Sequence, residues 1–584
     1  MARTWKLFAR SVVTRQRQRL RESEAAFILL ATVSGLIAGL LTNMQSALAH
    51  GIQQLLYGVT INRLSALGSI HHPWRLLALP LGGLCLVALG YFIGRRQRPP
   101  IDVVEANALH GGRIPFVDNL VIAAQTILSN GAGASVGLEA AYAQVGGGAA
   151  SFLGQQLKLR RNDLRMLVGA GAGAAVGAAF GAPLAGAFYA FEIVIGAYTP
   201  AAIAPVAAAA LAAALVTRSL HVDPYLIATT ATRLVSTADY LIYALLGLVC
   251  AVIGIAVMRM VTFVEMRVQS WQRLGNWRPV IGGCLLIPVA WLSPQSLSAG
   301  HGALHLDLAL HPSISFLLII LLLKIVASII SLSFGFRGGL FFASLFLGSL
   351  VGQIFAATLN LWFPGLAIDS TDAALVGMAA LSVSVVGGPM TLAMLMLETT
   401  HDFALMGVVL TASLIASAFT RETFGYSFST WRLHVRGSSV RSPRDIGWVI
   451  NLTASRLMRK DWVSVRDTLS IADFRAQIPL GSTSKAVVID ASGRYLGIVP
   501  TAIAYGSTLS ETAPVGSIAT LADTTLAASA DIHQILERLD HSGADELAVV
   551  DDHDVVLGIV TEKHVRRRYF EEIETSQRAM FGES

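Results

Sequence analysis

The sequence has few charged residues for its length. Only 14% of its 584 residues are Asp, Glu, Lys or Arg, whereas 54% are hydrophobic and the mean hydropathy is +0.60. A soluble protein of this size carries about a quarter charged residues. The shortage argues against a chain that is soluble throughout, and it indicates that much of the protein lies in a lipid bilayer.

Cysteines and metal-ligand patterns are also scarce. The three cysteines, Cys85, Cys250 and Cys284, lie in apolar runs, with no pair at metal-ligand spacing and too few for a secreted disulfide framework. The sequence has no convergent nucleophile and base set and no metal-spaced histidine cluster. We therefore expect neither an enzyme, nor a metal site, nor a required cofactor.

Positive charge is modest and unevenly placed. The net charge is +6, and seven Lys or Arg residues precede the first apolar run, within residues 1–24. Under the positive-inside rule, this basic segment lies in the cytoplasm. The charge gives no reason to expect a nucleic-acid partner. We expect a multi-pass protein of a bacterial-type inner membrane, with both termini cytoplasmic.

Apolar runs fill the chain from residue 25 to about 420. Several are shorter than the roughly 20 residues that a full span needs, and many are interrupted by glycine. Glycine lets helices approach closely, and it lets the backbone leave helical geometry beside protein or a water-filled cavity. The pattern predicts an all-α polytopic membrane domain over 25–435, followed by a domain of soluble composition over 448–575.

Two halves of the membrane part share a pattern about 200 residues apart. Each half contains a Gly-Leu-X step, a later glycine, a Gly-X-Pro step twelve residues after that glycine, and a glutamate nine residues after the proline. The matched positions are Gly137-Leu138-Glu139, Gly171, Pro183 and Glu192 in the first half, and Gly339-Leu340-Phe341, Gly377, Pro389 and Glu398 in the second. Repeats with short, interrupted apolar segments predict a transport site where the two halves meet.

Three residues are candidates for that site, each with a plainer alternative. Glu139 is a lone acid in an apolar stretch, which is costly at membrane depth and therefore a functional candidate, although an acid at a helix start is the alternative. Phe341 follows three glycines, so nearby backbone N–H groups could face an anion, or it could simply begin a helix. Tyr426 could donate a hydrogen bond to an anion or anchor the chain at the membrane interface.

The ordered motifs of the membrane part resemble those of the CLC family of chloride channels and chloride/proton antiporters, and indicate a bacterial member. The matching segments are Gly111-Gly112-Arg113-Ile114-Pro115, Gly137-Leu138-Glu139 with Gln144-Val145-Gly146, Ala182-Pro183-Leu184-Ala185-Gly186, Gly339-Leu340-Phe341 and Tyr426-Ser427. The resemblance implies an inverted-repeat fold of tilted helices and a homodimer with one pore per subunit. It also implies that Glu139 is the gate.

Further site residues also follow from the resemblance. The anion contacts would come from Gly112, Leu138, Ala140, Leu340, Phe341 and Tyr426. Gly112 stands where the family often has a serine hydroxyl, and Leu138 replaces a basic residue. Ile193 stands where proton-coupled members often carry a proton-transfer glutamate, so it favours passive conduction over proton exchange. Ala141 and Ala343 replace two motif prolines.

The soluble tail contains a second repeat. Ala486–Asp490 and Gly493–Val499 recur as Leu547–Asp551 and Val555–Val560, each a strand, a turn and a strand. The tail resembles a pair of CBS domains, at about 448–508 and 512–575, with an α+β fold. Such pairs often bind adenine nucleotides. Thr561 matches the ribose-binding pattern, whereas Pro500 and His564 depart from it, so a purely structural dimerising tail is an equal alternative.

These observations together predict anion transport, with chloride as the substrate and Glu139 as the gate of a passive channel. The first alternative is a chloride/proton antiporter, or a transporter of another small anion. The second is a membrane-tethered nucleotide sensor without transport.

Overall fold

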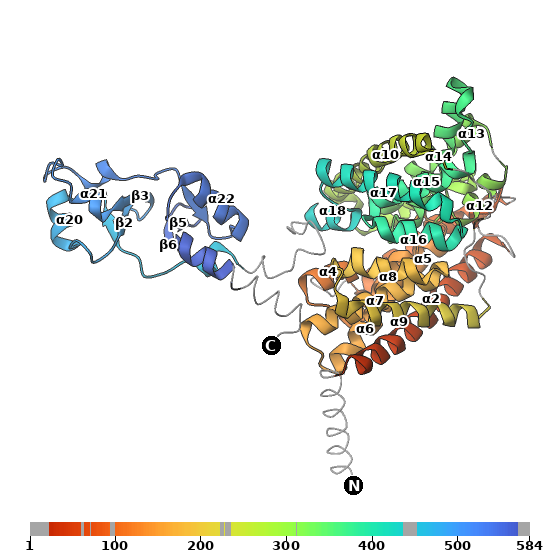
Figure 1. The fold of residues 1–584 in the computed structure, drawn as a ribbon, viewed down its shortest axis with the longest axis horizontal. Helices are drawn as coiled ribbons and strands as arrows, with labels where there is room; N and C mark the ends of the chain where they lie inside the picture. Colours follow the sequence, from red (N-terminus) through yellow and green to blue (C-terminus); the bar gives the residue numbers. More distant parts are fainter. Residues whose placement is uncertain are drawn as a thin grey trace, which may run out of the picture. The chain divides into compact units, whose positions relative to one another are not determined.

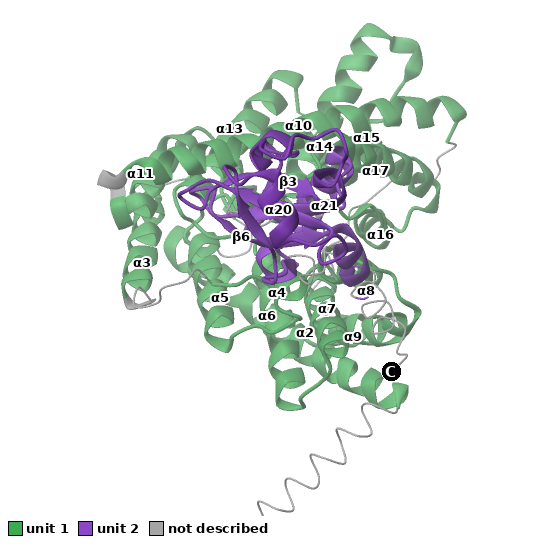
Figure 2. Cartoon of the chain, turned by 90° about the vertical axis from the view of Figure 1, so that its left-hand side faces the viewer, with its two compact units in different colours: residues 1–445 green, residues 446–584 purple. Residues whose placement is uncertain are grey.

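The computed structural model describes residues 23–59, 64–70, 72–93, 100–221, 227, 235–310, 312–435, 452–569 and 571. The chain divides into two compact units, residues 1–445 and 446–584 (Figure 2). The predicted membrane domain, 25–435, falls within the first unit, and the predicted tail, 448–575, falls within the second.

The first unit is helical throughout its described part (Figure 1). Its longer helices are α2 (Glu24–Tyr57), α3 (Ala78–Ile93), α4 (Val103–Leu109), α5 (Phe116–Gly131), α6 (Glu139–Gln156), α7 (Arg161–Phe180), α8 (Pro183–Tyr189), α9 (Pro200–Ser219), α10 (Thr237–Ser270), α11 (Arg278–Leu292), α12 (His301–Leu310), α13 (Ile314–Ser333), α14 (Phe341–Trp362), α15 (Ser370–Val386), α16 (Pro389–Thr400), α17 (Phe403–Thr423) and α18 (Phe428–Val435). A π-helical segment, η3 (Ala190–Ile195), continues α8, and short 3-10 turns join several of the other helices.

Eight helices in the described part are long and apolar enough to cross a bilayer. They alternate with shorter ones, such as α8 and α16, which cannot span it alone. Proline occupies the first position of both short helices, where its missing N–H breaks no helical hydrogen bond. The unit therefore combines full spans with half-length helices that begin or end inside the protein.

The sequence repeat corresponds to a repeated helix crossing. In the first half, α6 crosses α7 where Gly146 meets Gly171. In the second half, α14 crosses α15 where Gly348 meets Gly377. A Cβ atom on any of these glycines would overlap the backbone of the opposite helix. Small residues are what permit such close crossings in a membrane, so the glycine spacing of the sequence determines the packing of both halves.

In each half, a glutamate accepts hydrogen bonds from a helix start of the other half. Glu192, at the end of the first half, accepts hydrogen bonds from the N–H groups of Met390 (3.1 Å) and Thr391 (2.8 Å) and from the Thr391 hydroxyl (2.7 Å), all in the first turn of α16. Glu398, at the end of α16, accepts from two backbone N–H groups in the first turn of α8, at 2.9 and 2.8 Å. Each half thus caps a helix of the other.

The second unit contains two three-stranded sheets of the same order. In the first sheet, β1 (Ser464–Arg466) is parallel to β2 (Lys485–Ile489), which is antiparallel to β3 (Tyr495–Pro500). In the second, β4 (Thr525–Ala527), β5 (Glu546–Val550) and β6 (Val556–Thr561) pair in the same way. The helices of this unit are α19 (Ala454–Leu457), α20 (Ile471–Gln477), α21 (Thr501–Ala504) and α22 (Ile532–Ser542). The predicted strand–turn–strand repeat therefore forms the centre of each sheet.

One apolar cluster joins the two sheets of this unit. Val487, Tyr495 and Ile498 of the first sheet pack with Ala548 and Ile559 of the second, and all five are buried. Apolar faces of both sheets are thereby removed from water, and neither sheet would bury them alone. The two copies form one folded body.

Candidate functional site

The two halves of the first unit meet where α6 and α14 begin. The N–H of Gly137 donates to the carbonyl oxygen of Gly339 (2.9 Å), and the N–H of Gly339 donates to that of Gly137 (3.2 Å). Each glycine lies two residues before the first residue of its helix. The N-cap residues, Leu138 and Leu340, provide no side-chain cap. Helix starts of this kind leave backbone N–H groups able to bind an anion.

The Glu139 side chain occupies this junction. It is 2% exposed, and its carboxylate is hydrogen-bonded by its own backbone N–H and by that of Phe342, in the first turn of α14. Among the described residues, none hydrogen-bonds to its Oε2. The side chain folds against Gly137, where a Cβ atom would overlap Oε2. A carboxylate of the first half therefore lies at a helix start of the second half.

Glu139 lies between two cavities. A small one, of about 50 Å³, is lined by Glu139 and Leu138 together with polar side chains of α2, α5 and α12. A larger one, of about 400 Å³, is lined by Ala140 and Gly339 on the other side of the same junction. The neighbours of Glu139 in the chain, Leu138 and Ala140, thus line different cavities.

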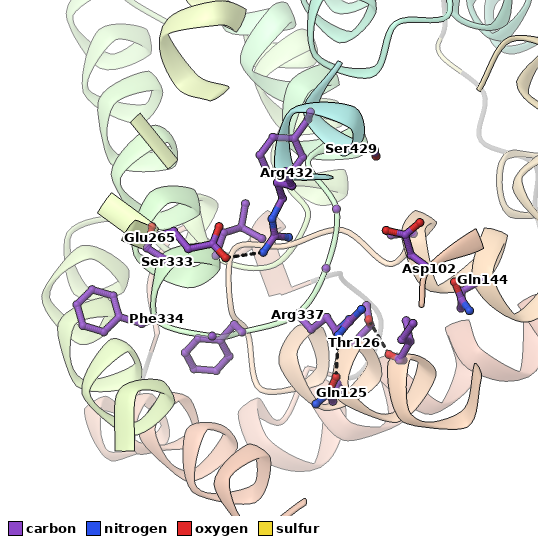
Figure 3. Close-up of a pocket in the computed structure, with 18 of the residues that line it drawn as sticks. Asp102, Gln125, Thr126, Gln144, Glu265, Ser333, Phe334, Arg337, Ser429 and Arg432 are labelled. Carbon is purple, nitrogen blue, oxygen red and sulfur yellow. Dashed lines mark hydrogen bonds and ion pairs between the residues drawn. The ribbon is translucent and has the colours of Figure 1, made fainter. Parts of the chain in front are cut away.

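The larger cavity is rich in polar and charged side chains (Figure 3). Arg432 forms an ion pair with Glu265 (2.9 Å), and Arg337 donates to Gln125 (3.3 Å). Asp102, the N-cap of α4, also lines the cavity, and its carboxylate accepts the N–H of residue 105 at 2.8 Å. The cavity thus contains two acids, of which Glu265 is paired with Arg432 and Asp102 faces a helix start, and the guanidinium of Arg337 adds a further positive charge.

A third cavity, of about 440 Å³, adjoins the larger of the two cavities beside Glu139, because both are lined by Val104 and Ser429. It contains Glu192 and Ile193 from the π-helical segment and Tyr426 before α18. Ile193 is 6% exposed. The position where the resemblance implies a proton-transfer acid is therefore a buried apolar side chain that lines this cavity.

Four of the six predicted anion-contact residues lie together. Leu138 and Ala140 flank Glu139 at the start of α6, and Leu340 and Phe341 lie at the start of α14, joined to them by the glycine bridge. The Phe341 ring packs against Phe180, with centroids 5.5 Å apart.

Gly112 lies elsewhere, which corrects its predicted position. It is in the turn after α4, where its carbonyl oxygen accepts the hydroxyl of Ser151 (2.7 Å). Ser151 is twelve residues beyond Glu139 on α6, or about 18 Å along the helix axis. The cavity is faced instead by the opposite end of α4, at Asp102 and Val103. The Gly-x-x-Ile-Pro match was too short to distinguish the two ends of this helix.

Tyr426 also departs from its predicted position. Its hydroxyl pairs with His434 Nδ1 (3.3 Å), and its ring stacks on that histidine. It lines the third cavity, whose lining includes neither Glu139 nor Phe341. Tyr426 is therefore directed along α18 and not toward the junction.

Lys324 was missed by sequence reasoning. It lies within α13, is 0% exposed, and donates to the carbonyl oxygens of Ser298 (2.7 Å) and Ser296 (3.3 Å). It also interacts electrostatically with Glu139. The signal was available, because a lysine inside a 20-residue apolar helix is costly without a role.

A hydrogen-bond network links Lys324 to the segment before Glu139. The Ser298 hydroxyl accepts from Asn130 Nδ2 (3.2 Å), which also donates to the carbonyl oxygen of Val136 (2.8 Å). The buried cation is thus held by neighbours that are themselves hydrogen-bonded.

Tyr189, the last residue of α8, was also missed. It lines the larger cavity, and its ring centroid lies 6.3 Å from that of Phe341. A tyrosine in an apolar helix is expected to be an aromatic residue of the core. The sequence therefore gave no reason to select Tyr189 as a site residue.

In the second unit, Thr561 ends β6 and pairs in register with Glu546 of β5. Its counterpart position in the first sheet, Pro500, ends β3 and pairs with Lys485. Thr561 is half-buried.

Comparisons with known proteins agree with this architecture. The profile of the voltage gated chloride channel family matches residues 94–421, and that of the CBS domain matches 515–571. The voltage-gated ClC-type chloride channel ClcB of Escherichia coli K12 is 28% identical over 355 residues, which are 60% of this chain and 84% of that protein.

Two solved structures share the fold. A slow cyanobacterial Cl⁻/H⁺ antiporter matches with a TM-score of 0.61 and 24% identity, over 70% of this chain and 97% of its own. A eukaryotic CLC transporter matches with a TM-score of 0.60 and 18% identity, over 94% of this chain and 98% of its own.

These matches confirm the predicted family, the helical membrane fold and the small α+β tail, and they make anion transport across a membrane, and not enzymatic catalysis, the function of the family. The chain is a multi-pass integral membrane protein of the voltage gated chloride channel (CLC) family that carries a C-terminal CBS domain.

Proposed function

We propose that this protein is a gated, passive chloride channel in which the Glu139 carboxylate is the gate. The observation that carries the proposal is the position of this carboxylate at the start of α14, between two cavities. A helix start that holds a carboxylate also suits a chloride ion, because both are anions that accept backbone N–H groups. Chloride and carboxylate therefore compete for one place.

Protonation of Glu139 decides this competition. A neutral carboxyl group is held less strongly by backbone N–H groups and leaves the site to chloride. Anion flux therefore rises as the pH falls. The anion contacts that we propose are the backbone N–H groups around Leu138, Ala140, Leu340 and Phe341.

Lys324 provides the positive charge of the gate region. Leu138, the residue before Glu139, is apolar and carries no charge. Lys324 is a fully buried cation that interacts with Glu139. A buried cation acts across a low dielectric and so favours any anion nearby, whether carboxylate or chloride.

Passive conduction is supported by the third cavity. Ile193 cannot carry a proton, and the neighbouring Glu192 is engaged by three hydrogen bonds from the start of α16. The alternative is chloride/proton antiport. It is favoured by the same glutamate, because Glu192 lines this cavity and could exchange protons with water there.

Several further features belong to the proposal. The domains are a basic segment (1–24), the pore (25–435) and a CBS pair (about 448–508 and 512–575). The protein forms a homodimer. Each subunit has its own pore, since residues of one chain form the junction and line its cavities. Both termini lie in the cytoplasm of a bacterial-type inner membrane, and the tail takes an adenine nucleotide near Thr561 or serves only as a dimerising element.

The test is chloride efflux from liposomes that contain the purified protein, with the potential clamped by potassium and valinomycin and the external pH recorded. We expect chloride to leave without proton movement and Glu139→Gln to increase the flux and abolish its pH dependence. Uphill proton movement driven by a chloride gradient would establish antiport. Unchanged pH-dependent flux in Glu139→Gln would remove Glu139 from the gate.

A further inference from the structure

Tyr189 is a phenol that lines the larger cavity close to the proposed gate. This side chain is 7% exposed and lines the larger cavity together with Ala140 and Gly339, the residues that adjoin the gate. Its ring lies against Phe341, with centroids 6.3 Å apart. It is also close enough to Glu139 to interact with it electrostatically. Tyr189 therefore lies where an anion would wait before the gate.

The Tyr189 hydroxyl has a free hydrogen to donate. Within the described part of the chain, no group hydrogen-bonds to it, although buried tyrosine hydroxyls usually find a partner. The Tyr426 hydroxyl, in contrast, is paired with His434 at 3.3 Å. The two phenols thus differ in both location and availability.

The charges around Tyr189 permit an anion. Asp102 is the acid that lines the same cavity near the phenol, and its carboxylate is turned to the start of α4, where it accepts a backbone N–H at 2.8 Å. The guanidinium groups of Arg337 and Arg432 line the cavity as well. Glu265 also lines the cavity, where it is paired with Arg432 (2.9 Å). A helix start reduces the field of Asp102, so Arg337 and the uncapped helix starts remain to attract a small anion.

We propose that Tyr189, and not Tyr426, donates the phenolic hydrogen bond to the anion that waits in the larger cavity before the gate. The ligand is a halide or another small monovalent anion, held by the Tyr189 hydroxyl and by backbone N–H groups at the starts of α6 and α14. This inference rests on the proposed function, since it names a contact on the same anion path.

A pair of matched variants tests the inference. Tyr189→Phe and Tyr426→Phe each remove one hydroxyl and keep the ring. Chloride affinity is measured by calorimetry on the purified full-length protein, and chloride efflux is measured in liposomes. A hydrogen bond to a charged group accounts for about tenfold in affinity. We expect Tyr189→Phe to weaken chloride binding about tenfold and Tyr426→Phe to leave it within about twofold.

A bromide soak locates the ion directly. Anomalous diffraction from crystals of the full-length protein in bromide should place an ion within hydrogen-bonding distance of the Tyr189 hydroxyl, and this ion should be lost in Tyr189→Phe. Bromide bound at Tyr426 and absent from Tyr189 would overturn the inference, as would unchanged chloride affinity in Tyr189→Phe. If the wild-type protein conducts chloride but Tyr189→Phe behaves identically, this inference alone fails. If the wild-type protein moves no anion, the proposed function fails with it.

Discussion

Gly137 provides the space into which the Glu139 side chain, the proposed gate, folds. A Cβ atom at this position would overlap Glu139 Oε2. Gly137→Ala should therefore displace the carboxylate from the start of α14 and raise basal chloride flux at neutral pH several-fold, measured by liposome efflux. The change acts on the closed gate and adds no charge.

Two comparisons isolate this effect. Gly51→Ala adds the same methyl group where no atom lies within 4 Å, and it should leave the flux unchanged. Gly137→Ala should also add nothing in a Glu139→Ala background, because the overlapping carboxylate is then absent. A further rise in that background would show that Gly137 acts through the backbone and not through the gate.

Lys324 favours both the Glu139 carboxylate and a chloride ion nearby. Its effect on chloride is therefore best measured in a variant whose residue 139 is uncharged. In a Glu139→Gln background, Lys324→Met removes a buried cation from the anion path and should lower chloride flux several-fold. Lys158→Met, on an exposed lysine, is the matched control and should have no effect. Equal flux in Glu139→Gln with and without Lys324→Met, for protein that elutes normally on size exclusion, would contradict the role.

Sequence reasoning selects a residue most readily where it carries an energetic signal. Glu139 stood out because an acid in an apolar stretch is costly, and the structure puts it at the junction of the halves. Gly112 and Tyr426 rested on matches of only a few residues, and the structure directs both away from the junction. Lys324 carried the same signal as Glu139, whereas Tyr189 resembled any core aromatic and could be found only from its place in the cavity.

At the scale of helices, the exchanged glutamates fix α8 and α16 to each other. Glu192→Ala and Glu398→Ala each leave backbone N–H groups of a helix start without an acceptor inside the protein. Each should lower the free energy of unfolding by about 1–3 kcal/mol, seen as a lower Tm in detergent.

The contacts of Glu192 and Glu398 are alike, so a second expectation concerns the relative size of the two effects. The two variants should have similar effects, and the exposed Glu422→Ala should have none. A large effect of one glutamate with no effect of the other would mean that the two caps are not equivalent.

Each sheet of the tail contains the same type of turn, closed by an aspartate side chain. The Asp490 carboxylate accepts the N–H groups of Ser492 (2.8 Å) and Arg494 (2.9 Å), and the Asp551 carboxylate accepts those of His553 and Val555 (2.9 Å each). Hydrogen bonds to Ser492 and Arg494 hold the pKa of Asp490 well below its usual range, and those to Val555 and His553 lower the pKa of Asp551.

The sign of the pKa shift sets the pH dependence. A depressed carboxyl pKa stabilises the turn above the usual aspartate pKa, near 3.9, and this stabilisation is lost only as the pH falls below it. At pH 7, Asp490→Ala should speed amide hydrogen exchange at 490–494 of the full-length protein, and more than at 551–555, where the Asp551 turn is intact although the two turns are in contact. Equal exchange in both turns of the variant would contradict the capping role.

Element patterns were predicted from the sequence where they were long or repeated. The strand–turn–strand units appeared as short apolar runs that recur, and they match β2, β3, β5 and β6 to within a residue or two. Strands β1 and β4 have three residues each, too few for a periodic signal, and they form because a parallel neighbour pairs with them. The exchanged glutamates could be seen as a repeat, but their partners depend on tertiary packing.

At the scale of the molecule, the gate and its three cavities belong entirely to the first unit. The cyanobacterial antiporter is matched over 97% of its length by only 70% of this chain, so a complete protein of this fold corresponds to the membrane unit. The tail forms its own apolar clusters from its own residues.

A chain truncated after Asp445 should therefore insert, fold and conduct chloride, with flux that rises at low pH and becomes pH-independent in Glu139→Gln. The measurement is liposome efflux at several pH values for the full-length and truncated proteins, each with and without Glu139→Gln. Equal pH dependence would assign gating to the membrane unit alone. If the truncated protein elutes normally on size exclusion but its flux is lost or no longer responds to pH, the tail takes part in gating and the assignment to Glu139 alone is wrong.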